Sequence, residues 1–360
     1  MSNEKKINIL DLSIEELEAL CIKLNIPKFR AKQIYSQSYM YKKFNQMNIP
    51  KETKEYLENN YYDNSVSLLK KFVGKDGTEK YLYIFRDGNI VEGVFMPHKY
   101  GNTLCVSTQV GCRMGCKFCA STLNGLIRNL SCGEILGQVL LVNKLQGGTL
   151  KDRKITNIVL MGSGEPLDNF DEVIKFIKLV SAKDGINISP RNISLSTCGL
   201  VDKIIKLADL KIPVILTISL HASNDETRKE IMPIANKYTI KEIINAAKYY
   251  YNQTGRRIIF EYSLIEGKNS TREEAKKLAN LLKGLNAHVN LINLNPVKER
   301  NLRGINGTTI NDFMDELTNN GISNTLRHSM GNDIGGACGQ LRSSYIEDPS
   351  KYFDDNDDNN

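Results

Sequence analysis

The cysteine-rich stretch at residues 105–120 decides the fold, and it reads Cys105-Val-Ser-Thr-Gln-Val-Gly-Cys112-Arg-Met-Gly-Cys116-Lys-Phe-Cys119-Ala120. Its last three cysteines follow the spacing C-x3-C-x2-C. Thiolates are soft ligands that favour iron–sulfur clusters, zinc or copper. A cubane cluster normally takes four cysteines, and no fourth cysteine or histidine lies at a matching short distance. Three cysteines in so tight a loop indicate a cluster with one iron left open for a small molecule, with structural zinc as the alternative.

Composition and charge narrow the class of protein. The 360 residues are 41% hydrophobic and 25% charged, which is ordinary for a globular protein, and no apolar run or signal peptide suggests a membrane. Eight cysteines without a secretory signal indicate a reducing compartment, so we expect a cytoplasmic protein. The net charge of +7 is compatible with a polyanionic partner such as RNA. Four acids in the last seven residues indicate a disordered tail.

The N-terminal part of the chain, residues 10–62, has a helical pattern. Ser13 and Glu16 form a possible capping box, a second helix is expected through 29–35, and a third after Pro50. Between them, the segment 39–44 interleaves aromatic residues with lysines. It could stack on bases and contact phosphates, or it could belong to a small helical bundle with a basic solvent face, which is the favoured interpretation.

A change to strand periodicity follows. Residues 80–85 and 90–95 flank Asp87-Gly88, so they predict a β-hairpin with an Asp-Gly turn. Glu92 interrupts the second apolar strand, either on a solvent face or as a placed functional acid.

Strand-like and helix-like segments then alternate, which predicts a parallel sheet with helical crossovers. Helical patterns occupy 131–146, 170–182, 226–231, 239–252 and 271–283. Strands are expected at 104–109, 154–161, 192–196, 213–220, 257–264, 287–294 and 322–327.

Polar groups recur after these strands, where active residues of such folds gather. They are Gly164-Glu165, Ser196, Ser219-Leu220-His221 and Asn295, and each could alternatively be a turn, a helix cap or a satisfied polar group. Near the C-terminus, Cys338 lies among glycines in a loop that suits a reactive thiol. Cys21, Cys132 and Cys198 have no comparable context, so we interpret them as core or incidental residues.

Taken together, these motifs resemble the RlmN-type RNA methyltransferases of the radical S-adenosylmethionine (AdoMet) superfamily. The resemblance extends from Phe29 to Arg342 and rests on four segments: 109–120, 162–167, 219–222 and 337–341. One departure is visible, because the family usually reads Asp-Ala-Ala-Cys where this chain has Gly335-Gly336-Ala337-Cys338.

The resemblance implies a role for each candidate site residue. A 4Fe-4S cluster would be held by Cys112, Cys116 and Cys119. The AdoMet site would be lined by Gly164, Glu165, Ser196, Ser219, Leu220, His221 and Asn295. In catalysis, Cys338 would be the thiol that becomes methylated, Cys105 the thiol that resolves the covalent adduct, and Glu92 the proton acceptor.

The resemblance also implies the reaction and its partners. The activity would be methylation of adenine carbon 2 in 23S rRNA and tRNA, with two AdoMet molecules per turnover and an electron donor such as flavodoxin or ferredoxin. The protein would act as a monomer without a membrane partner. A related carbon-8 methylase is the alternative, disfavoured by the longer N-terminal module and by Arg113-Met114 in the cysteine loop. A zinc-stabilised RNA-binding protein without catalysis is a third hypothesis.

We therefore expect an α/β fold, a partial (β/α)6 TIM-like barrel of the radical AdoMet type. The expected domains are a helical RNA-binding module at 1–70, a β-hairpin extension at 71–100, the barrel at 101–345 and the acidic tail at 346–360.

Overall fold

The central element of the fold is a run of seven parallel strands. A computed structural model describes residues 6–353 of the chain. Each of the seven strands pairs with the next one along the sequence. They are β6 (Thr103–Cys105), β9 (Asn157–Leu160), β10 (Ile193–Thr197), β11 (Ile215–Ser219), β12 (Ile258–Leu264), β13 (Ala287–Asn293) and β14 (Asn324–Leu326). All seven strands expected from the sequence are thus present, most of them shorter than expected.

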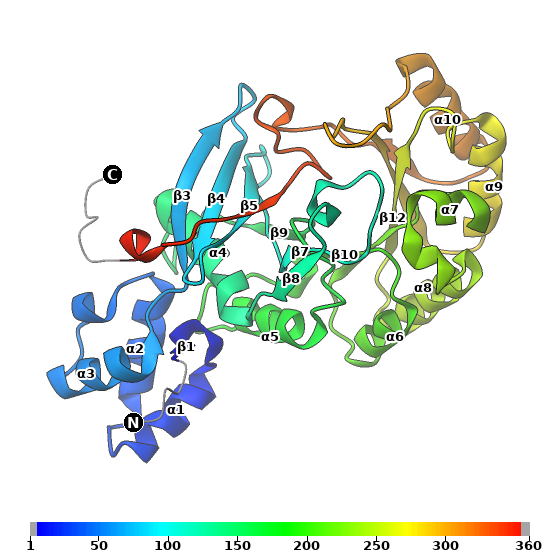
Figure 1. The fold of residues 1–360 in the computed structure, drawn as a ribbon. Coiled ribbons are helices and arrows are strands. Elements are labelled where there is room, and N and C mark those ends of the chain that lie inside the picture. The colour runs from blue at the N-terminus through cyan, green and yellow to red at the C-terminus, as the bar shows by residue number, and fades with distance from the viewer. Residues whose placement is uncertain (1–5, 354–360) are drawn as a thin grey trace.

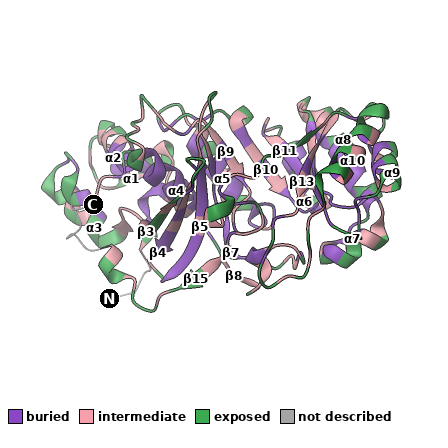
Figure 2. Ribbon diagram, turned by 90° about the horizontal axis from the view of Figure 1, so that it is seen from above, coloured by how far each residue is buried: buried purple, intermediate pink, exposed green. Residues whose placement is uncertain are grey.

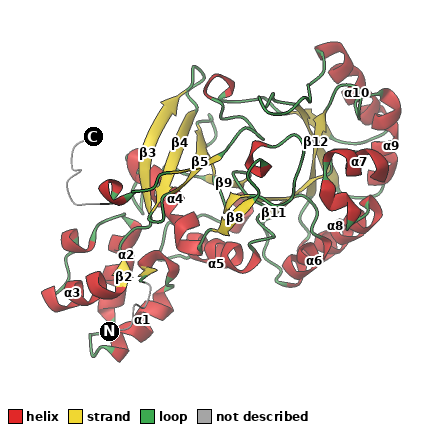
Figure 3. Ribbon diagram, in the orientation of Figure 1, coloured by secondary structure: helices red, strands yellow, loops and turns green. Residues whose placement is uncertain are grey.

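Helices connect these strands and cover the outer face of the sheet (Figures 1 and 3). They are α4 (Cys132–Leu145), α5 (Phe170–Ser181), α6 (Val201–Asp209), α7 (Asp225–Ile231), α8 (Ile240–Thr254), α9 (Arg272–Leu282) and α10 (Gly307–Asn319). Among the described residues, β14 does not pair back to β6, so the barrel stays open. Six strand–helix units and one extra strand confirm the predicted partial barrel.

The connecting helices form where local sequence and core packing agree. In α4, Ser131 and Glu134 make a reciprocal capping box, and Thr239 and Glu242 do the same for α8. The α5 helix buries Phe170, Val173, Ile174, Phe176, Ile177, Leu179 and Val180 against the sheet. Figure 2 shows this buried layer along the strands and the inner sides of the helices.

An antiparallel extension continues the barrel sheet beyond β6. It comprises β3 (Val66–Val73), β4 (Glu79–Phe85), β5 (Asn89–Met96) and β15 (Ser343–Tyr345). The predicted hairpin of β4 and β5 is confirmed, with Asp87-Gly88 at its turn. Gly88 has a φ of +82°, and a Cβ there would lie 2.0 Å from the carbonyl oxygen of Ile346, so the turn requires glycine. The hairpin therefore lies between β6 and the edge strand β3 of an 11-stranded sheet that includes the barrel.

The N-terminal module contains α1 (Ile14–Lys23), α2 (Phe29–Tyr39), α3 (Lys51–Asn60) and the short parallel pair β1 (Ile7–Asn8) and β2 (Tyr61–Tyr62). The capping box of Ser13 and Glu16 is present. Tyr39, Tyr41 and Phe44 are all buried, so these three rings cannot stack on bases. The favoured interpretation, a helical bundle with a basic solvent face, is the one that fits these rings.

Short 3-10 helices occur at Ile9–Asp11, Phe44–Gln46, Ala120–Thr122, Pro190–Asn192, Pro233–Asn236, Asn332–Ile334 and Ser350–Tyr352. Part of the expected acidic tail, residues 354–360, lies outside the described residues. Within the described chain, no helix has the length and apolar character needed to cross a membrane.

Candidate active site

The cysteine loop is held between two short antiparallel strands, β7 (Gln109–Gly111) and β8 (Leu126–Asn129). Gly111 has a φ of +74°, and a Cβ there would lie 2.0 Å from the Gly125 carbonyl oxygen, so only glycine fits before Cys112. The Thr122 hydroxyl donates to the carbonyls of Cys116 (3.1 Å) and Cys119 (2.9 Å). These bonds fix the backbone that presents the three thiols.

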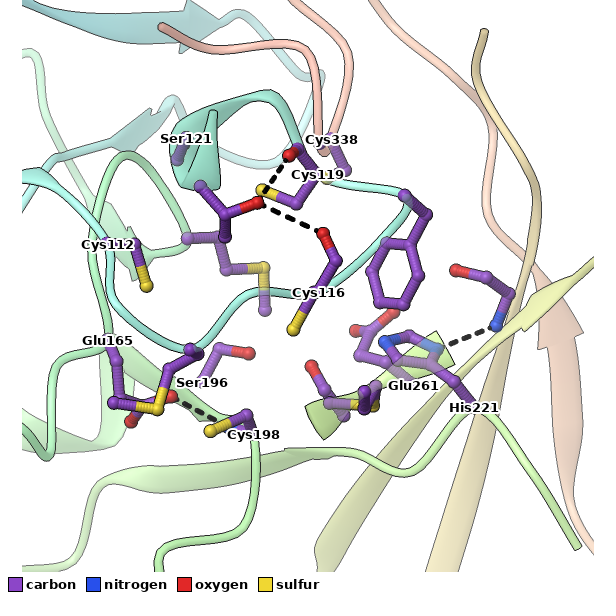
Figure 4. A pocket seen from close by; sticks show the side chains of 18 of the residues that line it. Cys112, Cys116, Cys119, Ser121, Glu165, Ser196, Cys198, His221, Glu261 and Cys338 are labelled. Carbon is purple, nitrogen blue, oxygen red and sulfur yellow. Dashed lines mark hydrogen bonds between the residues drawn. The ribbon is translucent and has the colours of Figure 1, made fainter. Parts of the chain in front are cut away.

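The three thiols face a common cavity, which we call the cluster cavity (Figure 4). Ten predicted site residues line it: Cys112, Cys116, Cys119, Gly164, Glu165, Ser196, Ser219, His221, Asn295 and Cys338. Three predicted residues, Leu220, Cys105 and Glu92, do not line it. The lining residues that were not predicted include Met161, Cys198, Glu261 and Arg327.

The spacing of the three thiols fits a cluster better than a zinc ion. Among residues 6–353, only one trio of His, Cys, Asp and Glu residues, Asp11, Cys132 and Glu172, has its ligand atoms within 4.8 Å of one another. At least one pair of the sulfurs of Cys112, Cys116 and Cys119 therefore lies more than 4.8 Å apart. Zinc–sulfur bonds of about 2.3 Å would draw three thiolates to roughly 4 Å of one another. Thiolates that each bind a different iron of a cubane lie farther apart.

Burial makes these thiols hard to ionise without a metal. It raises the pKa of Cys112 to about 12, and it also raises the pKa values of Cys116 and Cys119. A thiol that coordinates a metal cation is deprotonated outright. The site therefore fits a cationic iron centre that holds all three sulfurs as thiolates.

The Gly164-Glu165 turn follows β9 and is tied to the strand that precedes the cysteine loop. Gly164 has a φ of +110°, and a Cβ there would lie 2.6 Å from the Cβ of Gln109. The buried Glu165 carboxylate accepts from the backbone N–H groups of Leu167 (3.0 Å) and Cys198 (2.7 Å). Desolvation raises the pKa of Glu165. This carboxylate therefore shapes the cavity wall by binding backbone.

His221, after β11, is held in one tautomer. Its Nδ1 accepts from the Ser263 backbone N–H at 2.9 Å, so the neutral ring carries its proton on Nε2. Burial, with a contribution from the Arg228 cation, lowers the pKa of His221 to about 3. The ring also packs edge-on against Phe118 in the cysteine loop. A neutral imidazole can donate its Nε2–H to a ligand in the cluster cavity.

The buried cation Arg228 binds backbone carbonyls at the ends of β10 and β11. Arg228 is fully buried and donates to the carbonyls of Cys198 (2.6 Å), Ser219 (3.3 Å) and Leu220 (3.1 Å). The side chain of Leu220 is itself fully buried, so only its backbone can serve the site. Sequence reasoning missed Arg228, because in the charged helix α7 it looks like a surface residue.

A second cavity lies beside the first, and we call it the cysteine cavity. It is lined by Cys105 and Cys338 together with Val94, Met96, Met161, Leu341 and Arg327 among others. Cys338 is exposed, whereas Cys105 is buried, and burial with the adjacent Cys338 raises the pKa of Cys105 to about 12. All eight cysteines are free thiols. Cys338 thus faces both cavities, and Cys105 faces only the second.

The loop that carries Cys338 is fastened from two sides. Asn295 donates to the Cys338 carbonyl (3.2 Å), and it accepts from Ser329. Ala120 N–H donates to the Gly339 carbonyl (2.8 Å), and the Ser121 hydroxyl donates to the Leu341 carbonyl (2.8 Å). The cysteine loop and the thiol loop are therefore hydrogen-bonded to each other.

Arg327 is one of five residues that line both cavities, and its partner Glu261 lines the cluster cavity. The Nη1 of Arg327 donates to the almost fully buried Glu261 at 3.2 Å. The second oxygen of Glu261 has no partner in the described structure. Cys338 and Glu261 both raise the pKa of Arg327, so it stays charged. Neither residue was predicted, because an ion pair between β12 and the end of β14 leaves no local sequence signal.

Glu92 lines a third, basic cavity next to the same loop. Its carboxylate lies 3.4 Å from Lys80 Nζ and accepts from the Arg342 backbone N–H at 3.1 Å. Burial raises the pKa of Glu92, although Lys80 opposes the shift. On β5, Glu92 shares a face with Val94, which lines the cysteine cavity. Glu92 is therefore a partly buried acid that lines the basic cavity and lines neither the cluster cavity nor the cysteine cavity.

Comparison with known proteins agrees with this geometry. The family profile described as "Radical SAM superfamily" matches residues 106–282, and the profile "Ribosomal RNA large subunit methyltransferase N-terminal domain" matches residues 7–62. A crystal structure of a radical SAM methyltransferase from Sphaerobacter thermophilus superposes with a TM-score of 0.89 at 38% identity, covering 93% of this chain and 99% of that one. The fold and the three-cysteine cavity define a radical SAM enzyme.

The sequence relatives narrow the class to a family. Proteins described as "Probable dual-specificity RNA methyltransferase RlmN" from Clostridium novyi and Clostridium perfringens are each 52% identical to this chain. Each match covers 94% of this chain and 98% of the relative. The chain belongs to the RlmN-type dual-specificity RNA methyltransferases, and it is a radical AdoMet-dependent enzyme of that family.

Proposed function

We propose that this enzyme methylates carbon 2 of an adenine in 23S rRNA and in tRNA through a methylated cysteine. The observation that carries the proposal is the position of Cys338, which faces both the cluster cavity and the cysteine cavity. A thiol there can receive a methyl group on one side and deliver it to a base on the other. An adenine ring carbon is a poor nucleophile, so a thiol acceptor removes the need for direct transfer.

The cofactors are assigned from the donor set. Cys112, Cys116 and Cys119 would hold a 4Fe-4S cluster, and the backbone of Gly164 and the Nε2–H of His221 would contact AdoMet in the cluster cavity. When bound, the cluster and two AdoMet molecules per turnover supply a methyl group and a carbon-centred radical. The reaction would also need an electron donor such as flavodoxin or ferredoxin.

The protein's own groups then act in a defined order. The Cys338 thiolate takes the methyl group. One hydrogen atom of that methyl group would leave to the carbon-centred radical, and the remaining methylene carbon would bond to the base, with one electron returned to the cluster. Glu92 accepts the proton that leaves the base, since a carboxyl with a raised pKa is a better base. The Cys105 thiolate attacks the sulfur of Cys338. This attack forms a disulfide and breaks the sulfur–carbon bond, and the released carbon takes up a proton to become the methyl group of the base. Both thiols line one cavity, which supports this last step.

The RNA-binding region, the cellular location and the oligomeric state are also proposals. The N-terminal module at 1–70 would bind RNA through Arg30, Lys42 and Lys43, whose side chains lie outside its core. We place the enzyme in the cytoplasm, because eight free thiols suit a reducing compartment. We also propose that it acts as a monomer.

Nucleoside mass spectrometry of cellular RNA tests the proposed function. A strain that lacks this protein is complemented with the wild type or with Cys338→Ala. We expect 2-methyladenosine in rRNA and tRNA with the wild type and none with the variant. The appearance of 8-methyladenosine would assign the carbon-8 reaction instead, and unchanged RNA would reject both.

A further inference from the structure

The basic cavity beside the thiol loop has no role in the reaction described so far, apart from Glu92. It has a volume of about 610 Å³. Three segments of the chain form it: the β4–β5 hairpin, the loop after β13 and the thiol loop. Its charged lining residues are Lys80, Glu92, Lys298, Arg300, Arg303 and Arg342.

The basic cavity has more cationic side chains around it than carboxylates. Lys80 is paired with Glu92, and Arg342 makes a two-pronged ion pair with Glu299 at 2.6 and 3.0 Å. Five cations face these two carboxylates, which leaves three positive charges in excess. Such an excess around a solvent-filled space favours a bound polyanion.

Two of the cations are free to receive a ligand. Lys298 and Arg303 are exposed, and neither has an ion pair in the described structure. Arg300 is more constrained, since it donates to Thr122 at 3.0 Å. Its buried Nε has no partner among the described residues. The amides of Asn301, Asn332 and Gln340 add neutral donors to the wall.

The position of the cavity links it to the reaction. Gly335, Gln340 and Arg342 line the basic cavity, whereas the intervening Ala337 and Cys338 line the cysteine cavity. The thiol loop is therefore the common wall of the two spaces. In Figure 1 the orange segment after β13 and the red segment that carries Cys338 lie at the same edge of the barrel.

We infer that the basic cavity binds the backbone phosphates of RNA next to the target adenine, while the base itself enters the cysteine cavity. This inference rests on the proposed function, because it takes the base attached to Cys338 as its reference point. Arginine and lysine at the rim match phosphate by charge and by N–H geometry. The volume accommodates a stretch of phosphodiester backbone, and the shared wall keeps the base within reach of the thiol.

The salt dependence of RNA binding tests the inference. The probe is a synthetic RNA stem-loop with the anticodon-loop sequence of a substrate tRNA. For K298Q/R303Q the slope of log affinity against log salt should fall by about 1.4 to 1.8, since each cation contributes roughly 0.7 to 0.9. The control K241Q/K248Q removes two exposed lysines of α8, outside the three cavities, and should keep the wild-type slope.

A chemical substitution locates the contact. Neutral methylphosphonate linkages replace the phosphates on either side of the target adenine. They should weaken binding to the wild type at least fivefold and add little to K298Q/R303Q, because the partner charges are already gone. Equal losses in both proteins, or an unchanged salt slope, would overturn the inference.

Two readouts separate this inference from the proposed function. AdoMet binding and the visible spectrum of the cluster should be the same in the wild type and in K298Q/R303Q, because both substituted residues lie outside the cluster cavity. If the wild type forms 2-methyladenosine and the salt slope of the variant is unchanged, only the phosphate site is wrong. If the wild type forms none, the proposed function fails whatever the slope.

Discussion

At the scale of single residues, the two thiols of the cysteine cavity are predicted to behave differently. Cys105→Ala keeps the proposed methyl acceptor Cys338 and removes the thiol proposed to resolve the adduct, so RNA should copurify covalently with the variant. Denaturing gels with and without nuclease measure this. Cys21→Ala is a matched control, since Cys21 is also buried but lies in the N-terminal module. Normal turnover of Cys105→Ala without bound RNA would contradict the proposed role.

His221 makes a prediction about pH. Its pKa is about 3 in the folded protein and about 6.5 in the unfolded chain, so the unfolded state takes up the proton first as the pH falls. The stability contributed by the neutral ring is complete above about pH 6.5 and is lost between there and about pH 3. His221→Asn, which tolerates the φ of +55°, should unfold with a weaker pH dependence. Urea unfolding of both proteins at about pH 7 and pH 5 measures this difference in pH dependence. An equal change in the free energy of unfolding between the two pH values in wild type and variant would contradict the prediction.

At the scale of elements, the thiol loop departs from its family by two glycines that differ in their conformations. Gly335 has a φ of +63°, whereas Gly336 has no positive φ, and a Cβ at Gly336 would meet only ordinary contacts of 3.4 Å or more. Gly336→Ala should therefore stabilise the protein by about 0.4–1 kcal/mol by reducing the freedom of the unfolded chain. Gly335→Ala should destabilise it. Thermal unfolding compares the stabilities of the two variants. A Gly335→Ala protein more stable than Gly336→Ala would refute the argument.

Element order was the part of the structure most accessible from sequence. Alternating apolar strands and amphipathic helices predicted the seven parallel strands, because each pattern depends on a local period. Strand ends converge in a parallel sheet, so the glycine and polar residues at the carboxyl ends of β9, β10 and β11 were found as well. The ion pair of Arg327 with Glu261 and the burial of Arg228 were missed. Their partners are brought together only by the folded sheet, and no local pattern marks them.

At the scale of the whole molecule, the N-terminal module is joined to the barrel by polar contacts as well as by packing. Asp11 accepts from the Gly133 N–H (2.6 Å) at the start of α4, and the Tyr39 hydroxyl donates to the Leu179 carbonyl (3.3 Å). Asp11 therefore caps a barrel helix from another part of the chain and complements its dipole. The module and the barrel should unfold as one unit.

This junction gives a stability prediction. Asp11→Ala should lower the free energy of unfolding by about 1–2 kcal/mol, because a buried helix N-terminus loses its acceptor. Urea unfolding measures the change, and limited proteolysis should cut the N-terminal module sooner. Asp315→Ala, at an exposed position of α10, is the control and should change little. Wild-type stability of Asp11→Ala would show that packing alone holds the module.

The hydrogen bonds between the cysteine loop and the thiol loop have a consequence for biosynthesis. Ser121 and Leu341 are joined by one of them although they lie 220 residues apart in the chain. During translation the cysteines therefore leave the ribosome long before the segment that braces them exists. We expect the metal centre to be assembled after synthesis is nearly complete, and a chain that stops at residue 330 should bind less iron than the full chain. Equal iron content in the two would show that the cysteine loop matures alone.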